Sequence, residues 1–238
     1  SVKESGYEDI AQYRAPIKEI THHDVDSYKE ILNIVKRVEA GTLVIDSLSG
    51  LQQMLFDHVC QTLYNGKWDG VKGEKFFTNF WNGQRVDSPK EIEGLLCLLD
   101  NCVRKGVHVI LIAHSDIDDE PNATGADYKK YVIHLDKGIG KVLEKWAAHI
   151  FFMHIDININ ITEEAVNNKT VLGKAVDLDK RLMYVTQSPG HCAKNRELFP
   201  VTKPLIQMGS SSKTAYDNFY KALPELFRKA WPLKNQSS

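Results

Sequence analysis

A short apolar run that ends in an aspartate constrains the fold of this chain more than any other feature. Residues 42–47 read Thr-Leu-Val-Ile-Asp-Ser. A continuous apolar run is typical of a parallel strand that is covered on both faces. Ligands bind beyond the carboxyl ends of such strands, so Asp46, with Ser47 beside it, is a candidate to hold Mg²⁺. The run alone leaves a second interpretation open, in which Asp46 only caps the next helix.

The same unit of capped helix, glycine and apolar strand then recurs along the chain. A helix over 27–40 precedes the strand 42–46, and a helix over 88–105 precedes the strand 107–113. A third repetition runs from a helix near 137–148 into a strand at 150–155. This regularity predicts an α/β fold with a mostly parallel sheet and helices on both faces.

Two sequences of the capping-box type mark the starts of these helices. Ser27 is followed three residues later by Glu30, and Ser88 by Glu91. In a capping box the hydroxyl accepts the third backbone N–H of the helix, and the carboxylate bonds back to the cap. The pattern therefore predicts helices that begin at Ser27 and at Ser88.

The remaining segments define the domain organisation that we expect. The chain, 1–238, is predicted to form one domain, and 64–87 a surface excursion rich in glycine, asparagine, lysine and aromatic residues. The polar segment 156–180 is interpreted as an insertion. Residues 181–196 are interpreted as a hairpin at the sheet edge, turning at Ser188-Pro189-Gly190.

Charge and cysteine content exclude several classes of protein. The net charge of −1 gives no global field for nucleic acid, so any DNA contact has to come from a local patch. The four cysteines show no C-x-x-C spacing, which indicates reduced thiols and a cytoplasmic location. No stretch of 18 apolar residues is present, so we expect no membrane span.

The phosphate-binding motif G-x-x-x-x-G-K-[ST] does not occur in the 238 residues. The nearest match, 209–214, reads Gly-Ser-Ser-Ser-Lys-Thr after an apolar strand. Ser212 stands where the second glycine is needed, and a phosphate cradle relies on glycine conformations. We therefore predict that this segment caps a helix.

Three further groups could carry chemistry, each with a simpler alternative. His114 at the tip of its strand could bond a phosphate or an attacking water, or it could bond a neighbouring loop. Lys194 and Arg196 are two residues apart on a strand, so both could reach one phosphate, or they could be a surface pair. The acids of 116–120 could bind a metal, but a solvated acidic loop is favoured.

Taken in order, four segments resemble those of one family. They are Leu43-Val-Ile-Asp-Ser47, Val109-Ile-Leu-Ile-Ala-His114, Trp146-Ala-Ala-His-Ile-Phe-Phe152 and Cys192-Ala-Lys-Asn-Arg196. The order and spacing of these segments are similar to those of the phage RecA-like AAA ATPases that are linked to single-strand annealing. The resemblance covers roughly residues 15–225, a length typical of one domain. The resemblance implies a RecA-like P-loop NTPase core with a C-terminal β-hairpin.

The resemblance also implies roles for individual residues. Asp46 would be the acid that holds Mg²⁺ for ATP, with Ser47 beside it, and His114 would be the sensor on the neighbouring strand. Lys194 and Arg196 resemble the finger that RecA-like rings insert into the nucleotide site of the next subunit, a contribution of about 10³–10⁵ in rate.

Two departures from the family pattern are visible. The family's phosphate loop and first strand precede the matched region, so we expect the chain to be N-terminally incomplete or to be a non-hydrolysing relative. Glu4 is then the candidate remnant of the segment that supplies the catalytic base. The glycine that often follows the finger arginine is replaced by Glu197.

The leading functional hypothesis is an ATP-dependent DNA recombination protein in the cytoplasm of a phage-infected or bacterial cell. It would form a head-to-tail ring or filament and act beside a single-strand DNA-binding protein. Single-stranded DNA would be held by Lys129, Lys130 and Lys137 and by aromatic residues of the excursion. Two alternatives stay open: an inactive scaffold with the same fold, and a magnesium-dependent nuclease that uses Asp46 with the acids of 116–120.

Overall fold

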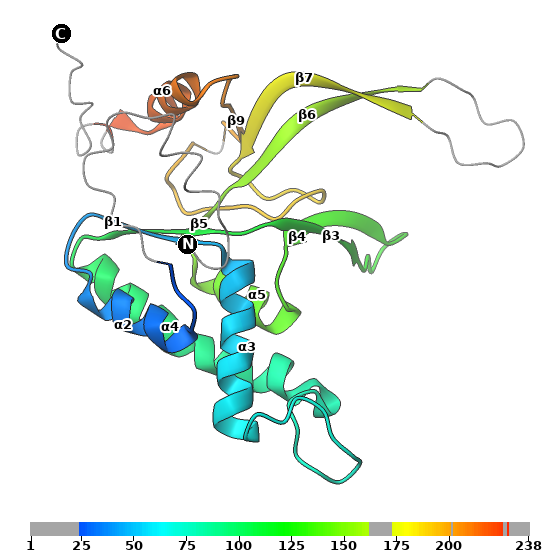
Figure 1. Ribbon diagram of the computed structural model, residues 1–238. Coiled ribbons are helices and arrows are strands. Elements are labelled where there is room, and N and C mark those ends of the chain that lie inside the picture. The colour runs from blue at the N-terminus through cyan, green and yellow to red at the C-terminus, as the bar shows by residue number, and fades with distance from the viewer. Residues whose placement is uncertain (1–23, 162–172, 201, 226–227, 229–238) are drawn as a thin grey trace, which may run out of the picture. The chain divides into compact units, whose positions relative to one another are not determined.

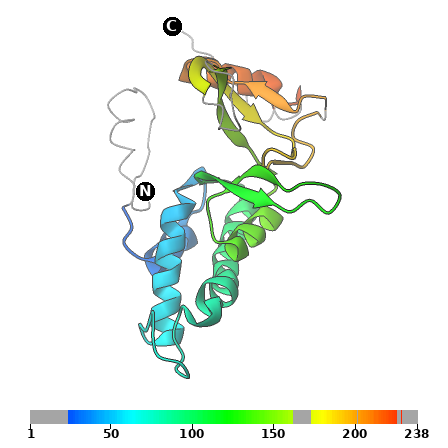
Figure 2. The ribbon, with the colours of Figure 1, turned by 90° about the vertical axis from the view of Figure 1, so that its right-hand side faces the viewer.

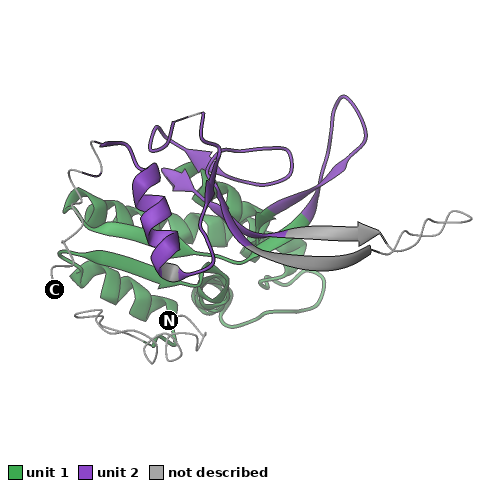
Figure 3. Ribbon diagram, turned by 90° about the horizontal axis from the view of Figure 1, so that it is seen from above, with its two compact units in different colours: residues 1–117, 132–146 green, residues 118–131, 147–238 purple. Residues whose placement is uncertain are grey.

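The computed structural model describes residues 24–161, 173–200, 202–225 and 228 (Figure 1). The chain forms two compact units, coloured in Figure 3. Unit 1 contains residues up to 117 together with 132–146, and unit 2 contains 118–131 together with residues from 147 onward. The single domain predicted from the sequence stays a prediction, and the structure divides the chain into these two units. Each unit is described by itself.

Unit 1 is a helical layer packed on a pair of parallel strands. Strand β1 is paired with β2 along its whole length, and the helices lie along the chain before, between and after the two strands (Figures 1 and 2). The elements of the unit are α2 (Tyr28–Arg37), β1 (Thr42–Asp46), α3 (Leu48–Tyr64), α4 (Ser88–Arg104), β2 (His108–Ile112) and α5 (Lys137–Trp146). The predicted helix–strand units at residues 27–46 and 88–113 are thus present.

The two strands are buried on one face only. Leu43, Ile45, Val109 and Leu111 pack into the core that α2, α3, α4 and α5 build. The alternate residues Val44, Ile110 and Ile112 are exposed. The expectation of strands covered on both faces was wrong for the part of the chain that is described, because there the helices pack against one side of the pair. The continuous apolar run therefore combines a core face with an exposed apolar face.

The two predicted helix starts have different outcomes. Ser27 is the N-cap of α2, and its Oγ accepts the backbone N–H of Glu30 at 3.3 Å. Helix α4 begins at Ser88 as predicted, but a π-helical turn, η2 (Gly83–Asp87), leads directly into it, so Ser88 is not its N-cap. The Ser88 hydroxyl donates to the carbonyl of Gly83 at 2.7 Å, so this predicted cap was wrong.

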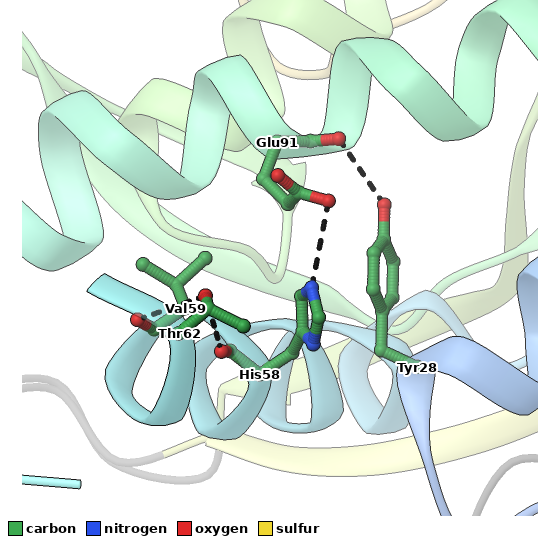
Figure 4. A network of polar contacts seen from close by, with 5 residues as sticks. All are labelled: Tyr28, His58, Val59, Thr62 and Glu91. Atoms are coloured by element: carbon green, nitrogen blue, oxygen red, sulfur yellow. Dashed lines mark hydrogen bonds and ion pairs between the residues drawn. The ribbon is translucent and has the colours of Figure 1, made fainter. Parts of the chain in front are cut away.

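A polar network ties three helices of unit 1 together (Figure 4). The Tyr28 hydroxyl donates to the backbone carbonyl of Glu91 at 3.2 Å, and the Glu91 carboxylate lies 3.6 Å from His58 Nε2. The rings of Tyr28 and His58 are 5.3 Å apart. Burial first, and then the nearby Glu91 charge, raise the pKa of Tyr28 above its ordinary value. The neutral phenol therefore acts as a buried donor that fixes α2 against α4.

Unit 2 is built on antiparallel pairs. Strand β6 pairs with β7, β7 pairs with β9, and β5 pairs with β8. A small core of Met183, Val185, Phe199 and Ile206 lies between this sheet and α6. The elements are β5 (His149–Ile150), β6 (Phe152–Ile161), β7 (Gly173–Tyr184), β8 (Lys194–Asn195), β9 (Leu205–Gln207) and α6 (Ser212–Ala222).

This arrangement changes three expectations of the sequence. The predicted third parallel strand at 150–155 falls on β5 and β6, which are antiparallel to their partners. The described residues of the predicted insertion 156–180 all belong to β6 and β7. In the predicted hairpin, 181–196, the Ser188–Gly190 turn is present, but β8 pairs with β5 and not with the strand before the turn.

Strands β3 (Ser115–Glu120) and β4 (Tyr128–Ile133) form a further two-stranded sheet, where the sequence predicted an acidic loop at 116–120. The mixed α/β class is thus confirmed, whereas a mostly parallel sheet is not found in the described ranges. Helix α6 begins as expected from the segment 209–214: Ser211 and Thr214 form a reciprocal capping box. That hydroxyl run caps a helix.

Candidate nucleotide site at the edge of the parallel strands

Asp46 and Ser47 occupy the junction between β1 and α3. Asp46 is the last residue of β1 and its side chain is exposed, while Ser47 is fully buried as the N-cap residue of α3. The Ser47 carbonyl accepts the N–H of Leu51 at 3.1 Å and so starts the helix. The peptide bond between Asp46 and Ser47 is cis. The sharp strand-to-helix junction leaves the carboxylate at the edge of the sheet.

His114 lies at the same edge. Strand β2 runs parallel to β1, and Asp46 is paired directly with Ile112, two residues before His114. Parallel neighbours end at the same edge of a sheet, so the ends of both strands lie side by side. The sequence placed Asp46 and His114 on adjacent strand tips, and the register confirms this adjacency.

The backbone of His134 is bonded both to the tip of β2 and to α3. Its backbone N–H donates to the carbonyl of His114 at 2.9 Å, and its own carbonyl accepts the Ser49 hydroxyl of α3 at 3.3 Å. One helical turn further, the amide oxygen of Gln52 accepts the N–H of Asp136 at 2.6 Å. These bonds fix the tip of β2 to the first turns of α3. Sequence reasoning missed them because backbone partners leave no residue signature.

The residues at this edge suit Mg²⁺ bound together with a nucleotide. Mg²⁺ usually keeps several waters and takes one or two protein carboxylates, and substrate phosphates complete its octahedron. The exposed carboxylate of Asp46 matches that pattern, whereas Ser47, predicted as a second ligand, is fully buried next to it. Among the described residues, no group of three or more histidine, cysteine or acidic side chains could hold a metal by itself. A metal here would therefore depend on phosphate oxygens.

Lys194 and Arg196 lie in unit 2, on β8 and just after it. The backbone N–H of Arg196 donates to His149 Nδ1 at 3.3 Å across the β5–β8 pair. Lys194 is half-buried, and Arg196 is exposed. Burial first, and then the charges of Arg196 and Lys194, lower the pKa of His149. Lysine and arginine side chains are groups that can bind an anion.

The other predicted site residues are more scattered. Glu4 lies outside the described residues. Lys129 and Lys130 are on β4, where they pair with Asp119 at 2.6 Å and Glu120 at 3.8 Å. Lys137 is the first residue of α5 in unit 1 and is exposed. The three lysines therefore do not form one patch within either unit.

The acids of 116–120 form β3 and are not gathered around one point. Asp116 and Asp118 accept the backbone N–H groups of the residues that follow them, at 2.7 and 3.0 Å. Asp119 and Glu120 are the partners of the β4 lysines. These side chains are engaged within the hairpin, so the geometry gives the nuclease hypothesis no support.

Comparison with known proteins gives one match. The family model described as "AAA domain" matches residues 4–197, well over half of the 238-residue chain. No curated protein and no solved structure matches the chain. Among the helices of the described ranges, none combines the length and the apolar character that a membrane span requires. The matched range includes β1, β2 and the Lys194–Arg196 segment. The chain belongs to the AAA domain family.

Proposed function

We propose that the chain binds ATP with Mg²⁺ at the edge formed by β1 and β2, and that it hydrolyses the nucleotide. Its family indicates an ATPase-type protein. The observation that carries the proposal is the direct parallel pairing of Asp46 with Ile112, which brings Asp46 and His114 to one edge. Open α/β sheets bind their ligands at this kind of edge.

The residues at the edge have distinct roles in this proposal. When bound, Mg²⁺ would neutralise charge on the phosphates. The Asp46 carboxylate holds the metal or its waters, and Ser47 lies beside it. His114 offers a hydrogen bond to a phosphate oxygen or to the attacking water, which would position that water. The His134 bridge keeps the strand tip in place for this contact.

Lys194 and Arg196 are proposed to act on the nucleotide of a neighbouring copy. Two cations beside a neutral His149 suit an anionic ligand, and an arginine supplied by another subunit stabilises the charge of phosphoryl transfer. This role requires a head-to-tail homo-oligomer, because each copy then gives its cations to the next. A closed ring or an open filament satisfies the same geometry.

The finer biological role is proposed from the family resemblance. ATP turnover would drive single-strand DNA annealing or recombination in a phage-infected or bacterial cell, with a single-strand DNA-binding protein as a partner. Lys129 and Lys130 are less suited to bind DNA than the sequence predicts, since they are paired with acids of their own hairpin. Lys137 remains a candidate contact.

Thermal unfolding with and without Mg-ATP tests the nucleotide site. We expect Mg-ATP to raise the Tm of the wild-type chain and to have no effect on Asp46→Ala. The control is Glu93→Ala, which removes an exposed acid of α4 and should leave the shift intact. A wild-type chain without a shift, or an Asp46→Ala chain that keeps it, contradicts the proposal.

A second candidate is a binding module that keeps the fold without hydrolysis. It is favoured by the absence of G-x-x-x-x-G-K-[ST] from the 238 residues, since the backbone cradle for the triphosphate depends on that loop. Phosphate release separates the two candidates. A Tm shift with Mg-ATP but no phosphate release identifies the binding module.

A further inference from the structure

The excursion between α3 and α4 presents two exposed aromatic side chains from a firmly anchored base. Phe80 is 87% exposed and Trp81 is 55% exposed. They belong to a short 3-10 turn, η1 (Asn79–Trp81), which precedes η2. Two other aromatic residues of the excursion, Phe77 and Trp68, pack into the core of unit 1. Phe80 and Trp81 do not.

The base of the excursion is built around Phe77. Its ring is fully buried against Phe56, Tyr64 and Trp68, at centroid distances of 5.5, 5.8 and 4.6 Å. A Cβ at Gly83 would lie 2.2 Å from the Phe77 ring, so only glycine allows the chain to pass there. The segment that presents the two exposed rings therefore begins and ends on a rigid anchor.

The backbone bonds of the excursion confirm this rigidity. The Phe77 N–H donates to the carbonyl of Lys67 at 2.9 Å, and the Thr78 N–H donates to that of Trp68 at 3.0 Å. The Gly83 N–H then donates to the Phe77 carbonyl at 3.0 Å, which closes the turn around the exposed pair. A loop closed in this way loses little conformational entropy when it binds a ligand.

Both exposed residues also have left-handed backbone conformations. The φ angles are +49° at Phe80 and +61° at Trp81. This region is unfavourable for bulky side chains, at a cost on the order of 1 kcal/mol or more for each residue. Burial of the rings does not offset the cost, because both remain exposed. Strain held at an exposed aromatic pair is typical of a binding surface.

Cations outnumber acids in the excursion by four to three: Lys67, Lys72, Lys75 and Arg85 against Asp69, Glu74 and Asp87. Of the acids, Asp69 accepts the Thr78 hydroxyl at 2.6 Å, Asp87 accepts the Tyr64 hydroxyl at 2.5 Å, and Glu74 pairs with Lys67. A cation also lies directly beside the exposed pair. The Arg85 guanidinium is 5.1 Å from the centre of the Trp81 ring, and Lys72 is exposed. The tip thus combines stacking surfaces with positive charge.

We propose that Phe80 and Trp81, with Arg85, form a stacking site for the bases of single-stranded DNA. Aromatic faces beside cations bind unpaired bases without sequence preference, because every base has a face that stacks. Asn79 and Asn82 flank the two rings in the sequence with polar side chains. The proposal names the DNA contact of the proposed function and rests on it for the choice of ligand.

The stacking site is separate from the nucleotide edge. Asp46 precedes α3 and the excursion follows it, and a helix of 17 residues separates its ends by about 25 Å (Figures 1 and 2). Binding of DNA and binding of nucleotide can therefore be measured and lost independently.

Fluorescence anisotropy with a labelled oligothymidine tests this site in the absence of nucleotide. We expect Phe80→Ala/Trp81→Ala to weaken binding by about tenfold or more, as the loss of one or two stacked bases predicts. Val71→Ala, a change at another exposed apolar residue of the same excursion, should bind like wild type. Arg85→Ala should reduce the salt dependence of binding, with a slope smaller by about one.

The outcomes separate this proposal from the nucleotide site and from other partners. Asp46→Ala should bind the oligonucleotide normally, so loss of nucleotide binding alone leaves the stacking site standing. Wild type that does not bind the oligonucleotide, or that binds duplex of equal length as tightly, overturns the proposal. Equal affinity of wild type and the double variant also overturns it and leaves a protein partner for these rings. Circular dichroism verifies that the double variant is folded.

Discussion

The two ends of α3 differ in which side chains they expose. We call the start of α3, at Asp46, the near end, and the end of α3, from which the excursion begins, the far end. At its start, a buried serine and an exposed carboxylate lie at the edge of a parallel pair, and backbone bonds through His134 hold the neighbouring strand tip. At its end, Asn65 adopts a left-handed C-cap conformation, and a loop anchored by Phe77 presents two exposed rings. The first end places polar groups where strands stop, and the second exposes apolar groups that folding would normally bury.

This difference shows how function can be separated along one rigid element. The edge at Asp46 needs only strand register and a helix start, which backbone geometry supplies. The tip at Phe80 needs an anchor strong enough to keep two unfavourable conformations. Because both ends belong to one core, changes in that core should affect both, whereas exposed changes should affect one.

The largest effect is expected from the anchor of the far end. Phe77→Ala removes a fully buried ring and should destabilise unit 1 by about 3–5 kcal/mol. Phe80→Ala makes the same chemical change at an exposed position and should not destabilise the protein. Chemical denaturation followed by tryptophan fluorescence measures both variants. Equal destabilisation by the two would contradict the description of the anchor.

The second-largest effect is expected at the near end, on the affinity for Mg-ATP. Asp46→Asn keeps the size of the side chain but removes its charge, and hydrogen bonds to a charged group contribute about 1.5–3 kcal/mol. Mg-ATP affinity should therefore fall about tenfold to a hundredfold, as measured by calorimetric titration. Oligonucleotide binding is the internal control, and a parallel loss of both ligands would show that the two ends are not independent.

The near end could be predicted from the sequence much better than the far end. The apolar runs that end at Asp46 and at His114 predict two strands and the polar residue at the end of each. The parallel pairing of β1 and β2 agrees with that prediction. Unit 2 could not be predicted in this way, since β5 and β8 are two residues long and their pairing is decided by contacts distant in sequence. A strand of two residues is too short to show the alternation of apolar and polar residues that predicts a strand.

At the far end, the exposure of individual aromatic residues could not be predicted, for a different reason. Five aromatic residues between Trp68 and Trp81 look alike in the sequence, and nothing in the composition says which are buried. The close passage of Gly83 over the Phe77 ring decides it, because that contact turns Phe77 inward and leaves Phe80 outside. The false cap at Ser88 has the same origin, since the π-helical turn before it is part of the same closure.

A smaller effect is expected from Tyr64, which links α3 to the end of the excursion. Burial first, and then the hydrogen bond and charge of Asp87, raise the pKa of Tyr64 to about 12. A raised pKa means that the stabilisation is complete below pH 10, the unfolded value, and is lost as pH rises toward 12. Tyr64→Phe should cost about 1–2 kcal/mol at neutral pH.

Denaturation at several pH values checks this dependence. The stability difference between wild type and Tyr64→Phe should shrink between pH 10 and pH 12, because the phenol of the unfolded wild-type chain ionises in this range while the folded phenol stays protonated until about pH 12. A difference that stays constant across this range would show that the Tyr64 hydroxyl is not held by the carboxylate.

The smallest effect, and the one that most sharply distinguishes the two ends, concerns the strained tip. Phe80→Gly should stabilise the protein by about 0.5–1 kcal/mol, since glycine adopts the left-handed conformation without the clash of a Cβ. Asn82→Gly is the matched control: its φ of −61° is helical, so glycine there should be neutral or destabilising. Phe80→Gly should at the same time weaken oligonucleotide binding. Higher stability with weaker binding would show that the strain is retained for the ligand, whereas a stability loss at Phe80→Gly would mean that the exposed ring supports the fold.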